Sequence, residues 1–326
     1  MNKLKVLELF GGIGAPRKAL QNLGIDFEVV DYVEIDKYAV KSYNAMYGEN
    51  YTPQSVLDWD KVIDVDLLVH GSPCQDFSPA GAGGGGDAGS GTRSSLMFET
   101  VRIVKEIKPK FVIWENVKGV LNKNHRHNFE KYLSALEKLG YKNYYQVLNS
   151  KDYGVPQNRQ RIFVVSTLED VGFSFPKPFE LKLRLGDILE KSVDKKYYLS
   201  DRMKKYINSY DNEKKDNGAG TYKVSTKRLV LNREVASTIS TRTGVNRADC
   251  SDYLCDDFSS NAPINGIDLT NFKIRKLTPL ECWRVMGFDE KSFLKAQSVN
   301  SNTQLYKQAG NSIVVPVLEE IFKNLL

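Results

Sequence analysis

Short apolar runs alternate with segments of helical periodicity over the first half of the chain. Runs rich in β-branched and aromatic residues predict strands at Val6–Phe10, Phe27–Val33, Asp66–His70, Phe111–Glu115 and Ile162–Ser166. Helical spacing of apolar side chains predicts helices at Lys37–Tyr47 and Ser94–Ile107. Strands that alternate with helices are typical of a parallel sheet wrapped by helices. The pattern therefore predicts an α/β fold for this part of the chain.

The pattern changes after Phe173. A Pro-containing stretch, Phe175–Pro178, leads into Lys-, Asn- and Gly-containing segments of weak periodicity, and order returns at Ile274. We therefore place a domain boundary near Gly172. We expect one domain from residues 1–172 plus about 300–326, and a second, smaller domain from residues 173–299.

Composition narrows the class of protein. A chain of 326 residues with 41% hydrophobic residues can bury a large core, and its net charge of +6 is compatible with a polyanionic partner. Four scattered cysteines favour a reducing compartment, and we expect no metal at the Cys250/Cys255 pair because the histidines lie far off in sequence. No signal peptide or membrane-spanning run is found, so we expect a cytoplasmic protein without membrane contact.

A glycine turn follows the first predicted strand. Phe10–Gly14 runs into the helical stretch Pro16–Leu20, and glycines at such a turn let a ligand approach the backbone closely. The dinucleotide fingerprint needs a further glycine where Arg17 stands, which disfavours a nicotinamide-dependent oxidoreductase. Glu34 ends the second strand, where a carboxylate can accept hydrogen bonds from ribose hydroxyls. Asp58 can accept from an adenine amine or serve as a helix cap. This spacing suits an adenosine cofactor without a pyrophosphate.

A candidate nucleophile follows the third predicted strand. Pro73-Cys74-Gln75 stands at that strand's end and opens a loop, Gly81–Gly91, that holds 7 of the 24 glycines. A thiol attacks only as a thiolate, which nearby cationic groups favour. Taken alone, this motif favours a buried structural cysteine, because free Cys packs as a small hydrophobe.

The order of these motifs resembles that of the DNA cytosine-5 methyltransferases. The blocks that carry the resemblance are Phe10–Gly14, Glu34, Asp58, Pro73–Gln75, Trp114–Val117, Gln157–Arg161, Arg275–Phe288 and Gln308–Val315. They cover both ends of the chain and leave only residues 173–272 unmatched. The resemblance implies a Rossmann-like sheet that binds S-adenosyl-L-methionine, released as S-adenosyl-L-homocysteine, and a smaller, mixed target-recognition domain.

The resemblance also implies catalytic roles. Cys74 would add to carbon 6 of a cytosine turned out of double-stranded DNA, and Glu115 would supply a proton or hydrogen bond to ring nitrogen 3. Arg161 would bind the base's carbonyl oxygen, and Arg159 would orient the nucleophile or a neighbouring phosphate. The alternative for both arginines is ion pairing at the surface.

The resemblance further implies two sets of binding residues. The expected cofactor contacts are Glu8, Phe10, Gly12, Gly14, Glu34, Ile35, Asp58, Pro73 and Asn311. The expected DNA contacts are Gln75, Ser78, Arg93, Arg228, Arg242 and Arg247. Between residues 221 and 247, six Lys or Arg stand against Glu234 alone, which favours phosphate contact beside a methyltransferase core. Ala15-Pro16 and Leu280 depart from the family pattern at positions that bear on local packing and not on a catalytic group.

Two further readings stay open within the family. A tRNA cytosine-5 methyltransferase shares these motifs, and an inactive DNA-binding relative would share the fold. The separate recognition segment argues against the first, and the presence of Cys74, Glu115 and Arg161 argues against the second. For an active DNA enzyme, we expect a monomer acting beside a restriction endonuclease or as phage protection against restriction.

Overall fold

The computed structural model describes residues 3–73, 96–210, 230–244, 252–255, 262–263 and 268–326. Its larger sheet contains β1 (Leu4–Leu9), β2 (Phe27–Val33), β3 (Leu67–His70), β4 (Phe111–Val117), β5 (Lys142–Asn149) and β6 (Gln160–Thr167), in the order β2-β1-β3-β4-β6-β5. The pairs β1/β2, β1/β3 and β3/β4 are parallel. The predicted strands are therefore present, although several are longer than the sequence pattern indicated.

The predicted parallel arrangement does not extend to one edge of the sheet. β6 runs antiparallel to both β4 and β5. The connection from β5 to β6, residues 150–159, is too short for a crossover helix, so the chain turns back beside the strand it has just left. β5 was not predicted, because this edge strand is exposed or half-buried from Lys142 to Val147 and contains no continuous apolar run.

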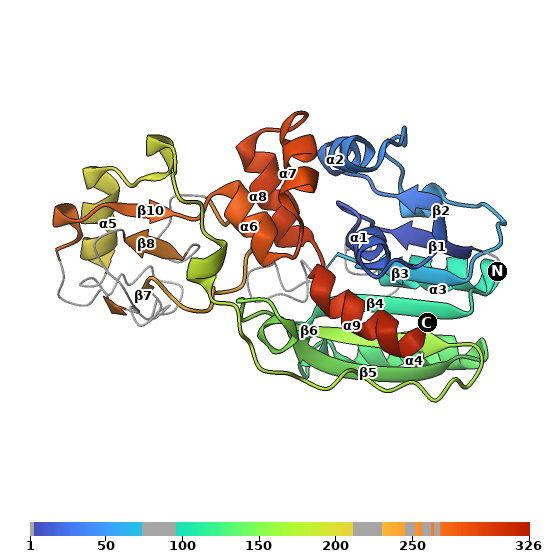
Figure 1. The fold of residues 1–326 in the computed structure, drawn as a ribbon. Coiled ribbons are helices and arrows are strands. Elements are labelled where there is room, and N and C mark those ends of the chain that lie inside the picture. Colours follow the sequence, from blue (N-terminus) through green and yellow to red (C-terminus); the bar gives the residue numbers. More distant parts are fainter. Residues whose placement is uncertain (1–2, 74–95, 211–229, 245–251, 256–261, 264–267) are drawn as a thin grey trace.

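Helices cover both faces of this sheet (Figure 1). On one face, α1 (Ala15–Asn22) and α9 (Val315–Leu325) share a core with Val6 and Val69. On the other face, α3 (Met97–Ile107) and α4 (Arg126–Lys138) share a second core with Leu68. Neighbouring residues of a strand thus enter opposite cores, as the two-residue repeat of a strand requires. α2 (Lys37–Tyr47) continues the helical layer beside β2.

A smaller sheet lies at the other end of the molecule. Its strands are β7 (Val230–Leu231), β8 (Tyr253–Cys255), β9 (Ala262–Pro263) and β10 (Ile274–Lys276), in the order β10-β8-β7-β9, with α5 (Asp201–Tyr210) beside them. The described 3-10 helices span Val56–Asp58, Lys118–Leu121, Ser150–Tyr153, Leu185–Ile188, Lys195–Tyr197 and Leu269–Asn271.

Three helices lie between the two sheets in Figure 1: α6 (Pro279–Val285), α7 (Glu290–Gln297) and α8 (Asn302–Asn311). α7 packs against α2 of the larger sheet although it lies inside the range 173–299. The division of the chain at 172 and about 300 remains a prediction.

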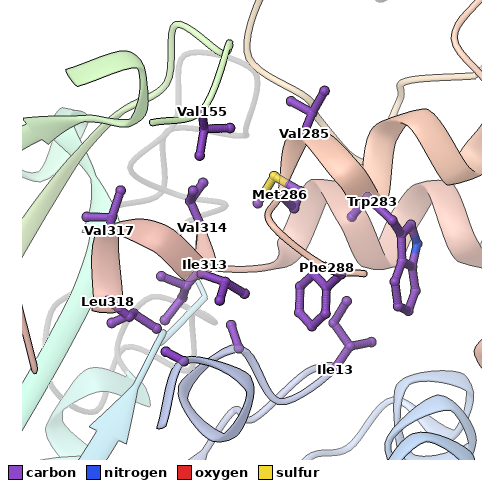
Figure 2. Packing of buried hydrophobic residues seen from close by; sticks show 14 of the residues in the cluster. Ile13, Val155, Trp283, Val285, Met286, Phe288, Ile313, Val314, Val317 and Leu318 are labelled. Carbon is purple, nitrogen blue, oxygen red and sulfur yellow. The ribbon is translucent and has the colours of Figure 1, made fainter. Parts of the chain in front are cut away.

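The late part of the chain packs onto the glycine turn. Figure 2 shows the Phe288 ring between Ile13 and Ile313, and Trp283 and Met286 belong to the same buried cluster. The C-terminal segments therefore cover the edge of the sheet where the candidate site lies. No helix in the described ranges is long and apolar enough to cross a membrane.

Candidate active site

The candidate residues gather at one edge of the larger sheet. Because β2, β1, β3 and β4 are parallel neighbours in that order, their carboxyl ends meet at the same edge. The ends of β1 and β2 carry six of the expected cofactor residues: Glu8, Phe10, Gly12, Gly14, Glu34 and Ile35. The ends of β3 and β4 carry Gly71–Pro73 and Glu115. The fold thus brings together segments that are far apart in sequence and places the two halves of the expected site side by side.

The glycine turn has an unusual backbone. Phe10, Gly12 and Gly14 all have positive φ, at 52°, 53° and 75°. The Gly12 N–H donates to Glu34 Oε2 at 3.0 Å, and the Asp36 N–H donates to Glu34 Oε1 at 2.7 Å. Burial raises the pKa of Glu34 although these backbone donors lower it. Glu34 therefore binds the turn directly, a contact that spacing alone did not predict.

The backbone of this turn is open at Gly12. A Cβ placed on Gly12 would meet nothing nearer than the Phe10 carbonyl at 4.0 Å. Ile35 is 72% exposed and Leu57 is 58% exposed, which is high for apolar side chains in a folded protein. Asp58 is exposed at the end of its 3-10 helix. Exposed apolar groups beside carboxylates suit a purine that needs both stacking and hydrogen-bond acceptors. Leu57 was not among the predicted residues.

The remaining expected cofactor residues differ in accessibility. Glu8 is fully buried, and its Oε1 accepts the Arg17 N–H at 2.9 Å, which caps the first turn of α1. Burial raises the pKa of Glu8 to about 7. Pro73 is half-buried, and Asn311 is exposed at the end of α8.

Glu115 and Arg161 form an ion pair in the region expected to hold the base. Arg161 Nε lies 3.2 Å from Glu115 Oε1, and both side chains are largely buried. A Cβ on Gly71 would lie 3.9 Å from Glu115 Oε2, so the carboxyl faces the segment that leads to Cys74. Burial raises the pKa of Glu115, against the opposing effects of Arg161 and Arg159. A carboxyl in this setting holds its proton more readily than one in water.

The segment before the candidate nucleophile is fixed from β4. Trp114 Nε1 donates to Ser72 Oγ at 3.0 Å, and Asn116 Nδ2 donates to the Ser72 carbonyl at 3.1 Å. Ser72 is buried. His70, also buried, lies within hydrogen-bond distance of Tyr132. Trp114 and Asn116, which hold the segment after β3, both belong to a block that carries the family resemblance, whereas Tyr132 does not.

Arg159 makes contacts that were not predicted. It is buried, and its Nη1 donates to the Ile239 carbonyl at 2.7 Å. Its Nη2 donates to the carbonyls of Gly310 and Ser312, at 3.1 and 3.0 Å. Arg159 therefore joins the segment at 239 to the end of α8. The expected role of Arg159 toward the nucleophile remains a prediction.

Several expected residues lie outside the described ranges. They are Cys74, Gln75, Ser78, Arg93, Arg228 and Arg247, together with the loop 81–91. Arg242 is described and exposed, three residues beyond the Ile239 carbonyl that Arg159 binds. Among the described residues, no group of three or more His, Cys, Asp or Glu side chains could hold a metal ion.

The chain belongs to the C-5 cytosine-specific DNA methylases, whose family profile matches residues 4–326. It is therefore a DNA (cytosine-5)-methyltransferase, and the expectation drawn from its motifs is confirmed. The type II methyltransferase M2.ScrFI of Lactococcus lactis subsp. cremoris is 33% identical, over 99% of each chain. The orphan methyltransferase M.SPRI of Bacillus phage SPR is 32% identical, over 100% of this chain and 98% of the relative.

Solved structures confirm the fold class. The Entamoeba histolytica methyltransferase EhMeth superposes with a TM-score of 0.77 at 17% identity, over 100% of this chain and 98% of that one. The S. pombe Dnmt2 methyltransferase gives a TM-score of 0.75 at 20% identity, with the same coverage. These likenesses concern the α/β architecture. The family to which the chain belongs uses S-adenosylmethionine and acts on cytosine.

Proposed function

We propose that this enzyme methylates carbon 5 of a cytosine within a specific short sequence of duplex DNA, with the cytosine turned out of the helix and bound covalently to Cys74. The observation that carries the proposal is the buried pair of Glu115 and Arg161, 3.2 Å apart, facing the segment that leads to Cys74. A buried carboxyl beside a guanidinium can protonate one ring atom while the guanidinium binds the adjacent carbonyl oxygen.

The reaction follows from the electronic needs of cytosine. Carbon 5 is a weak nucleophile, so the Cys74 thiolate first forms a bond to carbon 6. The displaced electron pair activates carbon 5, and Glu115 supplies a proton to ring nitrogen 3. Arg161 holds the carbonyl oxygen. S-adenosylmethionine supplies the methyl group that carbon 5 takes. A base then removes the carbon 5 proton, the double bond between carbons 5 and 6 forms again, ring nitrogen 3 returns its proton to Glu115, and Cys74 leaves as thiolate.

The cofactor would lie along the carboxyl ends of β1 and β2. Phe10 and the exposed Ile35 would contact the adenine, Asp58 its amine, and Glu34 the ribose hydroxyls. The backbone at Gly12 and Gly14 would line the methionine end, and Glu8, Pro73 and Asn311 are the further candidates. The open space over Gly12 and the exposure of Ile35 support this placement.

Duplex DNA is the proposed partner. The relatives are named type II and orphan methyltransferases, which supports a DNA target and a restriction–modification or phage context. Gln75, Ser78, Arg93, Arg228, Arg242 and Arg247 would contact the DNA. We further propose that the enzyme works in the cytoplasm as a monomer, beside an endonuclease of the same specificity or as phage protection against one.

Trapping tests the covalent step. Fluorine at carbon 5 cannot leave as a cation, so an adduct methylated at that carbon cannot be resolved. Random-sequence duplex DNA containing 5-fluorocytosine should form a complex that survives a denaturing gel, only with S-adenosylmethionine and not with Cys74→Ala. A complex formed with RNA and not with DNA would support a tRNA enzyme. Failure to trap either nucleic acid, with protein shown to bind the cofactor, would contradict the proposal.

A further inference from the structure

A fully buried tyrosine lies directly behind the glycine turn. Tyr32, on β2, is 0% exposed, and its hydroxyl donates to the Gly12 carbonyl at 2.7 Å. The Gly12 N–H donates to Glu34 Oε2 at 3.0 Å. Tyr32, near the end of β2, and Glu34, directly after it, therefore hold the carbonyl and the N–H of Gly12.

A second tyrosine holds the far side of the turn. Tyr47, on α2, has its hydroxyl 3.0 Å from the Gly14 carbonyl and 3.3 Å from the Ile13 carbonyl. The carbonyls of residues 12–14 thus accept hydrogen bonds from phenol groups on β2 and α2. None of these acceptors belongs to a regular ladder of the sheet.

The turn needs such support because its backbone is unfavourable. Phe10 has a φ of 52°, a left-handed conformation that is unfavourable for a residue with a Cβ. Gly12 and Gly14 also have positive φ. Contacts that hold one geometry are therefore required, and the hydroxyls of Tyr32 and Tyr47 provide them.

The tyrosine rings also explain two of the glycines. A Cβ on Gly11 would lie 2.6 Å from the Tyr32 ring, and one on Gly14 would lie 2.6 Å from the Tyr43 ring. Tyr32 and Tyr43 are themselves stacked, with ring centroids 3.8 Å apart. Gly11 and Gly14 thus allow the turn to lie on the rings, whereas Gly12 leaves open space where a ligand can approach.

We infer that Tyr32 is a positioning residue for the S-adenosylmethionine site, acting through the Gly12 backbone and not by touching the cofactor. Its hydroxyl sets the orientation of the Gly12 carbonyl. The Glu34 carboxylate accepts the Gly12 N–H and is thereby kept turned toward the proposed ribose position. The inference rests on the proposed location of the cofactor at this turn.

Cofactor binding by Tyr32→Phe is the test. The variant keeps the ring and its packing but leaves the Gly12 carbonyl without its donor. Titration calorimetry with S-adenosylhomocysteine should show binding about 3- to 10-fold weaker than in the wild type, the effect of one net hydrogen bond. In methylation assays, KM for S-adenosylmethionine should rise while kcat at saturating cofactor stays unchanged.

Tyr51→Phe is the matched control. Tyr51 lies in the same cluster, with its ring 5.3 Å from that of Tyr32, but its hydroxyl points to the Val29 carbonyl at 3.5 Å. This variant should bind the cofactor product like the wild type. Equal weakening in both variants would assign the effect to packing of the cluster and overturn the inference.

The remaining outcomes separate this inference from the proposed function. If the wild-type protein binds no S-adenosylhomocysteine, the cofactor proposal itself fails. If the wild type binds and Tyr32→Phe binds equally well, only the role of Tyr32 is refuted. Should Tyr32→Phe fail to fold, Tyr47→Phe tests the same idea, because its hydroxyl supports the next carbonyls of the turn. Unchanged affinity in that variant would then refute the inference.

Discussion

The guanidinium of Arg161 lies 3.2 Å from the carboxylate of Glu115, and the two residues come from antiparallel neighbouring strands. Arg161 pairs with Val117 in the ladder, two positions beyond Glu115, so both side chains stand on the same face of the sheet as diagonal neighbours. If β6 ran parallel to β4, its amino-terminal residues, Arg161 among them, would lie at the opposite edge of the sheet from Glu115. The reversal of β6 is therefore what completes the site.

Glu115→Gln should reduce methyl transfer by about 100- to 10,000-fold, the usual effect of losing a general acid. The amide keeps the shape of the side chain but cannot give up a proton to the base. Affinity for S-adenosylhomocysteine should be unchanged, because β3 separates β4 from β1.

Since burial raises the pKa of Glu115, the wild-type rate should fall as rising pH removes the proton from Glu115. Methylation assays across pH check both points. A Gln variant with near wild-type rates would contradict the assignment.

Glu34→Ala should weaken cofactor binding by about 1.5–3 kcal/mol, the range for hydrogen bonds to a charged group. The substitution also removes the acceptor of the Gly12 N–H. Calorimetry with S-adenosylhomocysteine measures the loss. Glu28→Ala is the control, because Glu28 is exposed nearer the start of the same strand. Similar affinities for the two variants would count against a role of Glu34 in the cofactor site.

Gly310→Ala should destabilise the protein by about 1–3 kcal/mol, the usual cost of overpacking. The added Cβ would lie 2.3 Å from the Ser240 carbonyl carbon and 2.4 Å from the Thr241 nitrogen, so backbone must move. Because Arg242, a proposed DNA contact, directly follows the displaced Ser240–Thr241 segment, this movement should also weaken DNA binding. Denaturant unfolding and DNA-binding assays give the two quantities.

Gly186→Ala is the control for that change, because its Cβ would meet nothing within 4 Å. It should leave both stability and DNA binding close to wild type. If Gly310→Ala and Gly186→Ala have the same free energy of unfolding, residues 240–241 shift without destabilising the protein, and the prediction is contradicted.

Glu8→Gln should change how stability depends on pH. Burial raises the folded-state pKa of Glu8 from 4.5 to about 7, so the folded protein keeps this proton at a pH where the unfolded chain releases it. The stabilisation is complete below about pH 4.5 and is lost as pH rises to about 7, for a total on the order of 3 kcal/mol. The stability of the wild type relative to Glu8→Gln should therefore decrease across this range. Denaturant unfolding at several pH values checks it, and a constant difference would contradict the expectation.

The order of the local elements was predictable from the sequence. Phe27–Val33 and Lys37–Tyr47 have the bounds in the structure that their periodicity predicted. The motif order also identified the family, and it placed Glu34 and Glu115 at strand ends. These features are local, because periodicity records which side of a segment faces a core and a motif records residues close in the chain.

Only the tertiary structure determined which segments became partners. The direction of β6, the edge strand β5 and the pairing of Arg161 with Glu115 depend on contacts between distant residues. Arg159 binds three carbonyls in segments more than 70 residues away, and no local pattern contains that information. For the same reason, the sequence alone did not explain why each glycine of the turn is needed. Their sequence indicates a ligand, whereas Gly11 and Gly14 are required by tyrosine rings that other segments bring behind the turn.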